Sequence, residues 1–199
     1  MRRIISLALA LTVAACSSPE EVATETTAPP TTTPTTAPAS TTTTELPPFA
    51  VSSPAFEDGD PIPVEYTCEG SDISPELQVV GLPEATNAIA IIVDDPDAPL
   101  GTWDHWVEFD IPAGTGSYQI SSDASPIGVT GVNSWNLEGY MGPCPPPGEE
   151  HTYHFTVYAL DEPVGLPAGV GSAELRAAME GRVLASVELR GTYQRQEAG

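Results

Sequence analysis

A tight pair of carboxylates and a histidine follow one another in the middle of this chain. Asp95 and Asp97 flank a proline, and His105 comes ten residues after Asp95. Imidazole exchanges protons near neutral pH, and a neighbouring carboxylate favours its protonated form. Titratable groups gathered in this way mark binding or catalytic sites more often than plain structure. The pattern indicates a pocket for a small polar or anionic ligand.

A second group of the same kind follows a proline-rich run. Gly142 and Pro143 open the sequence GPCPPP, and His151 and Tyr153 come shortly after it. Prolines lack an amide proton and fix φ, so this run must form a loop at the end of a strand. A rigid loop loses little entropy when a ligand binds, which suits the rim of a small pocket.

Period-two alternation predicts that strands position these groups. Helix start and stop signals predict one short helix over 173–180, with Ser172 as N-cap and Gly181 beyond the end. The sum is a mainly antiparallel β domain with little helix. The predicted strands are 77–82, 88–94, 104–111, 152–160 and 185–193.

Strand alternation also predicts that the titratable groups converge. Asp95 continues the apolar row of 88–94, and His151 precedes the row that contains Tyr153. On the same reasoning, His105 shares a face with Val107, Phe109 and Ile111. If these strand ends meet, they form a cavity with an apolar floor and polar walls. The alternative is that both histidines are ordinary core residues; their convergence with two carboxylates favours the pocket.

The N-terminus predicts export and anchoring. Residues 1–15 have a basic start and an apolar run too short to span a bilayer, which is typical of a signal peptide. Small residues directly before Cys16 resemble the lipobox of bacterial lipoproteins, in which this cysteine carries the lipids. The alternative is an ordinary cleaved signal with an incidental cysteine. We expect an extracytoplasmic protein that is lipid-anchored to the cell membrane.

Residues 16–48 are predicted to be a disordered tether between the lipidated cysteine and a domain at 49–199. After Cys16 the stretch carries twelve threonines and seven prolines and no aromatic or basic residue. Such a composition buries too little apolar surface to offset the entropy of ordering. In an extended polyproline conformation the tether would reach about 100 Å.

Charge excludes one class of partner. The formal net charge is −22, and the chain contains no lysine. A nucleic-acid-binding protein needs a basic surface to neutralise phosphates, so we expect no nucleic-acid partner. With no basic residue near the motifs in the sequence, an anion would have to be held by histidine, Tyr153 and backbone N–H groups rather than by a guanidinium.

Two cysteines remain for the domain. Cys68 and Cys144 form an even pair, which in an oxidising compartment favours a disulfide. The alternative is two buried thiols.

Taken together, the motifs resemble the phosphatidylethanolamine-binding protein (PEBP) family, and in particular its bacterial Raf-kinase-inhibitor-like branch. The resemblance covers about residues 49–194. It rests on the ordered motifs 68–75 (CEGSDISP), 95–99 with His105-Trp106, 131–135 (GVNSW), 139–146 (GYMGPCPP), and Gly148 with His151, Tyr153 and Phe155.

The resemblance implies a PEBP-like antiparallel β-sandwich, with a large central sheet, a smaller sheet and a short C-terminal helix. It also implies a surface pocket for phosphate-like or carboxylate anions, such as a phospholipid head group, without catalysis and without a cofactor or metal. By position, the implied ligand-binding residues are Asp95, His105, His151 and Tyr153, flanked by Asp97, Gly142 and Pro143.

Two other functions remain open. Family members also act as kinase or protease inhibitors and as scaffolds, so a protein partner in the cell envelope is the first alternative. A metal-dependent hydrolase using Asp95, Asp97, His105 and His151 is the second, since these residue types suit a divalent metal. Neither a His-Glu-x-x-His nor a Gly-x-Ser-x-Gly motif supports it.

Overall fold

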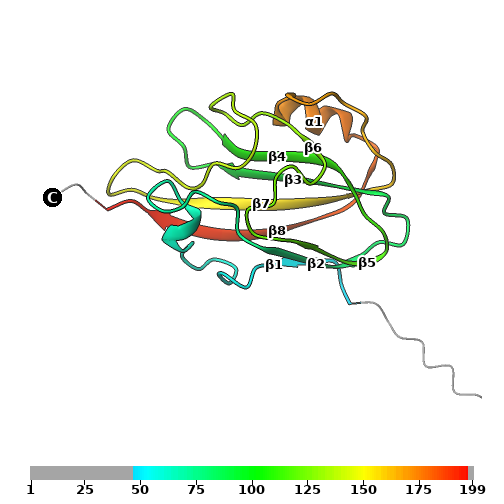
Figure 1. The fold of residues 1–199 in the computed structure, drawn as a ribbon, viewed down its shortest axis with the longest axis horizontal. Coiled ribbons are helices and arrows are strands. Elements are labelled where there is room, and N and C mark those ends of the chain that lie inside the picture. The colour runs from blue at the N-terminus through cyan, green and yellow to red at the C-terminus, as the bar shows by residue number, and fades with distance from the viewer. Residues whose placement is uncertain (1–46, 197–199) are drawn as a thin grey trace, which may run out of the picture. The chain divides into compact units, whose positions relative to one another are not determined.

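Two antiparallel sheets and one short helix make up the described part of the chain (Figure 1). The computed structural model describes residues 47–196. The predicted signal peptide, Cys16 and nearly all of the tether lie outside this range. Within it, none of the helices combines the length and the apolar character that crossing a bilayer requires.

The large sheet has the strand order β6-β4-β3-β7-β8, and the small sheet has the order β1-β2-β5. The five predicted strands are confirmed within three residues at each end. Three short strands were not predicted, namely β1, β5 and β6. The bounds are β1 Ala50–Ser52, β2 Leu77–Leu82, β3 Ala88–Asp95, β4 Trp103–Pro112, β5 Gly116–Ile120, β6 Val129–Thr130, β7 Glu150–Leu160 and β8 Val183–Gln194, with a 3-10 turn η1 at Val64–Tyr66 and helix α1 at Ser172–Ala178.

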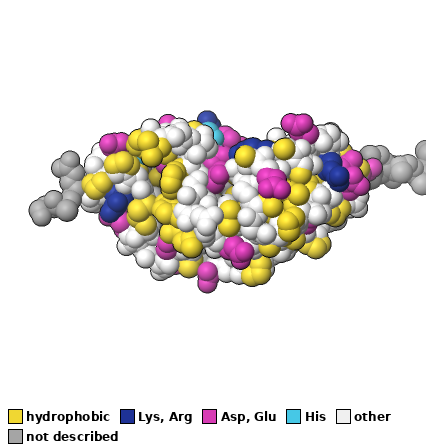
Figure 2. All heavy atoms as spheres, turned by 90° about the horizontal axis from the view of Figure 1, so that it is seen from above, with side chains coloured by type: hydrophobic (Ala, Val, Ile, Leu, Met, Phe, Trp, Pro, Cys, Tyr) yellow, Lys and Arg dark blue, Asp and Glu magenta, His cyan; other side chains and the backbone are white. Residues whose placement is uncertain are grey.

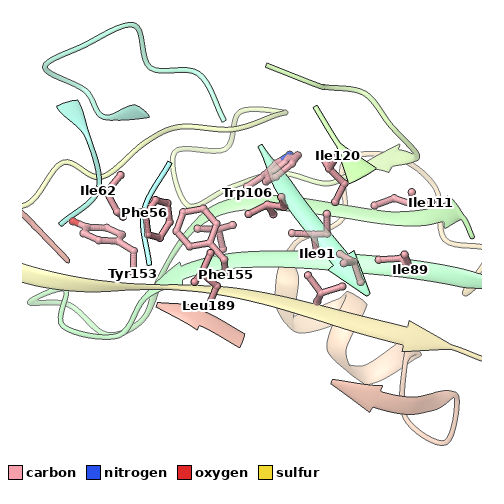
Figure 3. Packing of buried hydrophobic residues seen from close by; sticks show 14 of the residues in the cluster. Phe56, Ile62, Ile89, Ile91, Trp106, Ile111, Ile120, Tyr153, Phe155 and Leu189 are labelled. Atoms are coloured by element: carbon pink, nitrogen blue, oxygen red, sulfur yellow. The ribbon is translucent and has the colours of Figure 1, made fainter. Parts of the chain in front are cut away.

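The main core lies between the two sheets (Figure 3). Strand β3 is buried on both faces, which explains its unbroken apolar sequence. Strand β7 alternates instead, so one of its rows enters this core and the other row is half-buried. The sandwich expected from the sequence is confirmed, and its main core includes Leu77, Val79, Ile89, Ile91, Val93, Trp106, Tyr153 and Phe155.

A second, smaller core covers the opposite face of the large sheet. Helix α1 contributes Leu175, and Met179 follows at its end. The predicted N-cap is wrong by one residue: the cap is Gly171, and no side chain caps the helix. The Ser172 hydroxyl instead donates a hydrogen bond to Asp104 on β4 at 2.6 Å, so it ties the helix to the sheet.

Strand β4 does not follow a simple alternation. Relative to β3 it carries an extra residue at His105 and another near Asp110, whose φ is +51°. The first bulge turns His105 and Trp106 toward the same side, whereas Val107 and Phe109 pack in the second core. The prediction that His105 shares a face with Val107 and Phe109 is therefore wrong, and the bulge is what directs the imidazole toward the cavity described below.

A disulfide joins Cys68 to Cys144, with the two Cα atoms 5.5 Å apart. It links the loop after η1 to the proline-rich loop before β7. Acidic side chains are spread over the face in Figure 2, with few basic groups among them. This distribution agrees with the strongly negative net charge.

Candidate functional site

A cavity of about 430 Å³ opens where four strands of the large sheet begin or end. Asp95 ends β3, Trp103 starts β4, His151 lies at the start of β7, and Arg195 follows β8. The predicted meeting of strand ends is therefore present. The lining consists of Asp95, Ala98, Pro99, Leu100, Trp103, His105, Trp135, Cys144, Pro145, Pro146, His151 and Arg195.

Asp95 and His151 form a buried pair in the wall of the cavity. His151 Nδ1 lies 2.7 Å from Asp95 Oδ2, and both side chains are about 5% exposed. Burial alone would lower the pKa of His151, but the hydrogen bond to Asp95 and its negative charge outweigh burial and raise it. Since Nδ1 is engaged, Nε2 remains as the N–H that a ligand can reach, with Glu149 Oε2 3.6 Å away.

The pKa of His105 is shifted in the opposite direction. Its Nδ1 lies 2.6 Å from the carbonyl oxygen of Met141, which can only accept, so Nδ1 carries the proton. Burial lowers the pKa of His105, although Met141 and Asp95 partly oppose this shift. A neutral imidazole with its proton on Nδ1 presents Nε2 as an acceptor. Its ring meets the edges of Trp135 and Tyr153 at centroid distances of 5.0 and 5.1 Å.

Tyr153 lies behind the cavity wall rather than in it. Its side chain belongs to the main core (Figure 3), and its hydroxyl is buried with no hydrogen-bond partner among residues 47–196. Burial and the negative charge of Asp95 raise the pKa of Tyr153 far above its usual value. The phenol therefore stays neutral, with its hydroxyl close to the carboxylate of Asp95.

The other three predicted ligand-binding residues support the site without lining it. Asp97 Oδ2 accepts a hydrogen bond from the backbone N–H of Thr152 at 2.8 Å, which ties the loop after β3 to β7. Gly142 donates its N–H to Asp72 Oδ1 at 2.6 Å, and the Pro143 carbonyl accepts from the backbone N–H of Cys68. These contacts fix the two rims of the cavity.

Several lining residues were not assigned to the pocket by the sequence analysis, among them two tryptophans and an arginine. Trp103 and Trp135 stand edge to face at 5.3 Å and form an aromatic wall. Arg195 brings a guanidinium to the cavity, so the expectation that none would be near is wrong. Arg195 lies 40 residues beyond Phe155, the end of the nearest motif, and the pairing of β7 with β8, in which Glu150 lies opposite Gln194, brings it to the cavity. No signal in the sequence could have revealed that register.

The geometry does not favour a metal. In the part of the chain that the structure describes, His, Cys, Asp and Glu side chains nowhere group in threes as metal ligands. Asp95 is bonded to His151, and Asp97 is turned to the backbone of Thr152. What remains is a mixed recognition surface, with N–H donors at His151 and Arg195, an acceptor at His105 and aromatic faces between them.

Comparison with known families matches residues 52–194 to the model described as phosphatidylethanolamine-binding protein. Among solved structures, the homologue CT736 from Chlamydia trachomatis superposes with a TM-score of 0.70 at 35% identity, covering 75% of this chain and 99% of that one. E. coli YbcL, a member of the mammalian PEBP family, gives a TM-score of 0.68 at 29% identity, covering 74% of this chain and 99% of YbcL.

Sequence relatives point the same way. The UPF0098 protein PH1269 of Pyrococcus horikoshii is 45% identical over 149 residues, which is 72% of this chain and 75% of that protein. A UPF0098 protein of Aquifex aeolicus is 42% identical over 152 residues, which is 73% of this chain and 88% of that protein. With the family model, the sandwich and these relatives in agreement, the chain belongs to the phosphatidylethanolamine-binding protein family.

Proposed function

We propose that this domain is a non-catalytic binding module for a small phosphate-like anion or a phospho head group. The observation that carries the proposal is the convergence of Asp95, His105 and His151 around one cavity, each at most 4% exposed. Buried titratable groups at the mouth of an apolar cavity are typical of a ligand site. The volume of about 430 Å³ suits a small ligand rather than a polymer.

The two histidines contact different groups of the ligand, one as a hydrogen-bond donor and the other as an acceptor. Protonated His151 donates from Nε2 to an oxyanion, and this hydrogen bond is strengthened by the positive charge. Neutral His105 accepts at Nε2 and so suits a hydroxyl or ammonium group of the same ligand. A phosphoethanolamine-like molecule carries both kinds of group. The described cavity residues offer hydrogen-bond donors, an acceptor and aromatic faces, which are groups for binding, rather than a nucleophile activated by a base, which catalysis would use.

Calorimetric titration with inorganic phosphate, O-phosphoethanolamine and sulfate across a pH series tests the proposal. Because the pKa of His151 is raised, its positive charge persists to higher pH than that of a free histidine and is lost as pH rises through the folded-state value. We expect sulfate affinity to fall over the same interval, since sulfate keeps a constant charge there. Equal sulfate affinity at acidic and alkaline pH would refute the role of His151, and no binding of any probe would refute the function.

We also propose that Cys16 anchors the protein to the outer side of the cell membrane through lipids, with the Thr/Pro-rich stretch as spacer. Two or more acyl chains hold a protein far better than one, since each buried methylene adds about 0.8 kcal/mol. Replacing Cys16 with Ser should move the protein from the membrane fraction to the soluble fraction. A Cys16→Ser protein that still sediments with membranes would contradict the anchor.

An inhibitor or scaffold role is the second candidate, and the cavity rim favours it. Leu100 lines the cavity and is 91% exposed, and Leu137, two residues along the chain from the lining residue Trp135, is 53% exposed. A protein partner from the envelope that these residues contact would bind irrespective of His151. Crosslinking in intact cells with His151→Ala beside Leu100→Asp separates the two functions, because only the second variant should lose such a partner.

A further inference from the structure

Arg195 differs from the other basic side chains in how its charge is satisfied. Arg176, Arg182 and Arg190 each form an ion pair with a carboxylate at 2.7, 2.7 and 2.8 Å. Arg195 has only a long contact, with its Nε 3.8 Å from Glu69. Within residues 47–196 no other lysine or arginine occurs, so Arg195 is the one whose guanidinium is not held by a close carboxylate.

Its remaining contacts are equally weak. Nη1 of Arg195 lies 3.5 Å from the carbonyl oxygen of Pro145, and Nε is buried with no hydrogen-bond partner in the described range. The carboxylate of Glu69 is also engaged elsewhere, because its Oε2 accepts a hydrogen bond from the Tyr193 hydroxyl. A guanidinium has five N–H donors in a planar fork, and a buried donor without a partner is costly. Most of these donors remain available to a ligand.

The position of Arg195 places its N–H donors at the candidate ligand site. It lines the same cavity as Asp95, His105 and His151 and approaches from the end of β8, beside the start of β7. In a chain with a net charge of −22, anions are repelled at long range. A local guanidinium inside the cavity therefore matters more here than it would in a neutral protein.

We infer that Arg195 is the residue that binds the anionic group of the ligand, with its fork directed at two oxygens of a phosphate monoester, and that Glu69, 3.8 Å from Nε, competes only weakly for the guanidinium. The inference rests on the proposed function and names the class of ligand for that site. The fork of arginine matches phosphate oxygens in a bidentate manner, which a lysine ammonium does not reproduce. His151 then provides a second contact to the same anion.

The test compares Arg195→Met with Arg190→Met by calorimetric titration with inorganic phosphate and O-phosphoethanolamine. Both arginines belong to the C-terminal strand region and both changes remove one positive charge, but Arg190 pairs with the exposed Asp58. We expect Arg195→Met to weaken binding by at least about tenfold, as for loss of a charged hydrogen bond, and Arg190→Met to change it less than about threefold. Arg195→Lys should fall between wild type and Arg195→Met.

The outcomes separate the inference from the function on which it rests. A wild-type protein that binds neither probe refutes both. A wild-type protein that binds, with the Met variants at 195 and 190 equally affected, refutes the role of Arg195 and leaves the pocket standing. Glu69→Gln gives an independent measure, since removing the negative charge nearest to the guanidinium should tighten phosphate binding; weaker binding would contradict the inference. Thermal unfolding of each variant shows that the fold is kept.

Discussion

Replacing Asp95 with Asn tests the central pair of the cavity directly. Asparagine keeps the shape of the side chain and can still accept the Asp97 N–H, which lies 2.9 Å from Oδ1. It removes the negative charge that sits 2.7 Å from His151 Nδ1. The change therefore alters the charge and the hydrogen-bonding group that face His151 while it keeps the packing.

The expected loss of stability follows from burial and protonation. Hydrogen bonds to charged groups contribute about 1.5–3 kcal/mol, and loss of one partner of a buried pair costs about 3–5 kcal/mol. The amide group of asparagine can still form a hydrogen bond with the unprotonated imidazole of His151. We therefore expect a loss of stability of about 2–3 kcal/mol at acidic pH, which is closer to the first range than to the second. The raised pKa of His151 means that its contribution is fully present below about pH 6.5, the value in the unfolded chain, and is lost as pH rises through the folded value. The deficit should shrink accordingly.

Urea unfolding of both proteins across a pH series measures this, with NMR titration of the His151 ring as a second readout. Glu188→Gln is the matched control, since it removes a carboxylate that lies 3.1 Å from His154, which is on β7 like His151 but in a pair whose side chains are 28% and 41% exposed. Exposed pairs contribute about 0–1 kcal/mol, so its effect should be small. If both variants lose equal stability, or if the His151 titration does not move toward lower pH in Asp95→Asn, the reasoning is wrong.

Two further predictions concern the scaffold around the cavity. Replacing Cys68 and Cys144 with Ser opens a loop of 76 residues and should lower the free energy of unfolding by about 4.5 kcal/mol in the chain-entropy model, measured by urea unfolding. A change below about 1 kcal/mol would contradict it. Gly142→Ala would place a Cβ 2.1 Å from the carbonyl oxygen of Tyr66 and should cost about 1–3 kcal/mol, whereas Gly114→Ala meets nothing within 4 Å. Equal melting temperatures would argue against this.

The long strands could be predicted from the sequence because their buried positions are occupied by apolar residues at a regular spacing. The unbroken apolar run of β3 identifies a strand that is buried on both faces, and the alternation of β7 identifies a strand and the row that enters the core. Strand β1 has three residues and β6 has two, and segments of this length show no period. The short strands therefore become visible only once the partner strand is in place.

The site was predicted in part, and the failures share one cause. Asp95 and His151 stand at the ends of rows whose phase is regular, so their convergence could be foreseen. His105 sits on a bulge, which shifts the phase by one residue without a signature in the sequence. Arg195 depends on the register between β7 and β8, a relation between segments far apart in the chain. Local patterns carry no information about either.

The burial of all eight residues of β3 has an evolutionary consequence. The innermost strand anchors Asp95, whereas part of the aromatic and apolar wall, including Leu100 and Trp135, belongs to connecting loops. Substitutions in such loops cost little folding free energy, whereas changes in a packed strand cost a great deal. Exchanging loop residues of the cavity wall can therefore change which ligand is recognised while strand β3 is kept, so that one fold can serve several specificities.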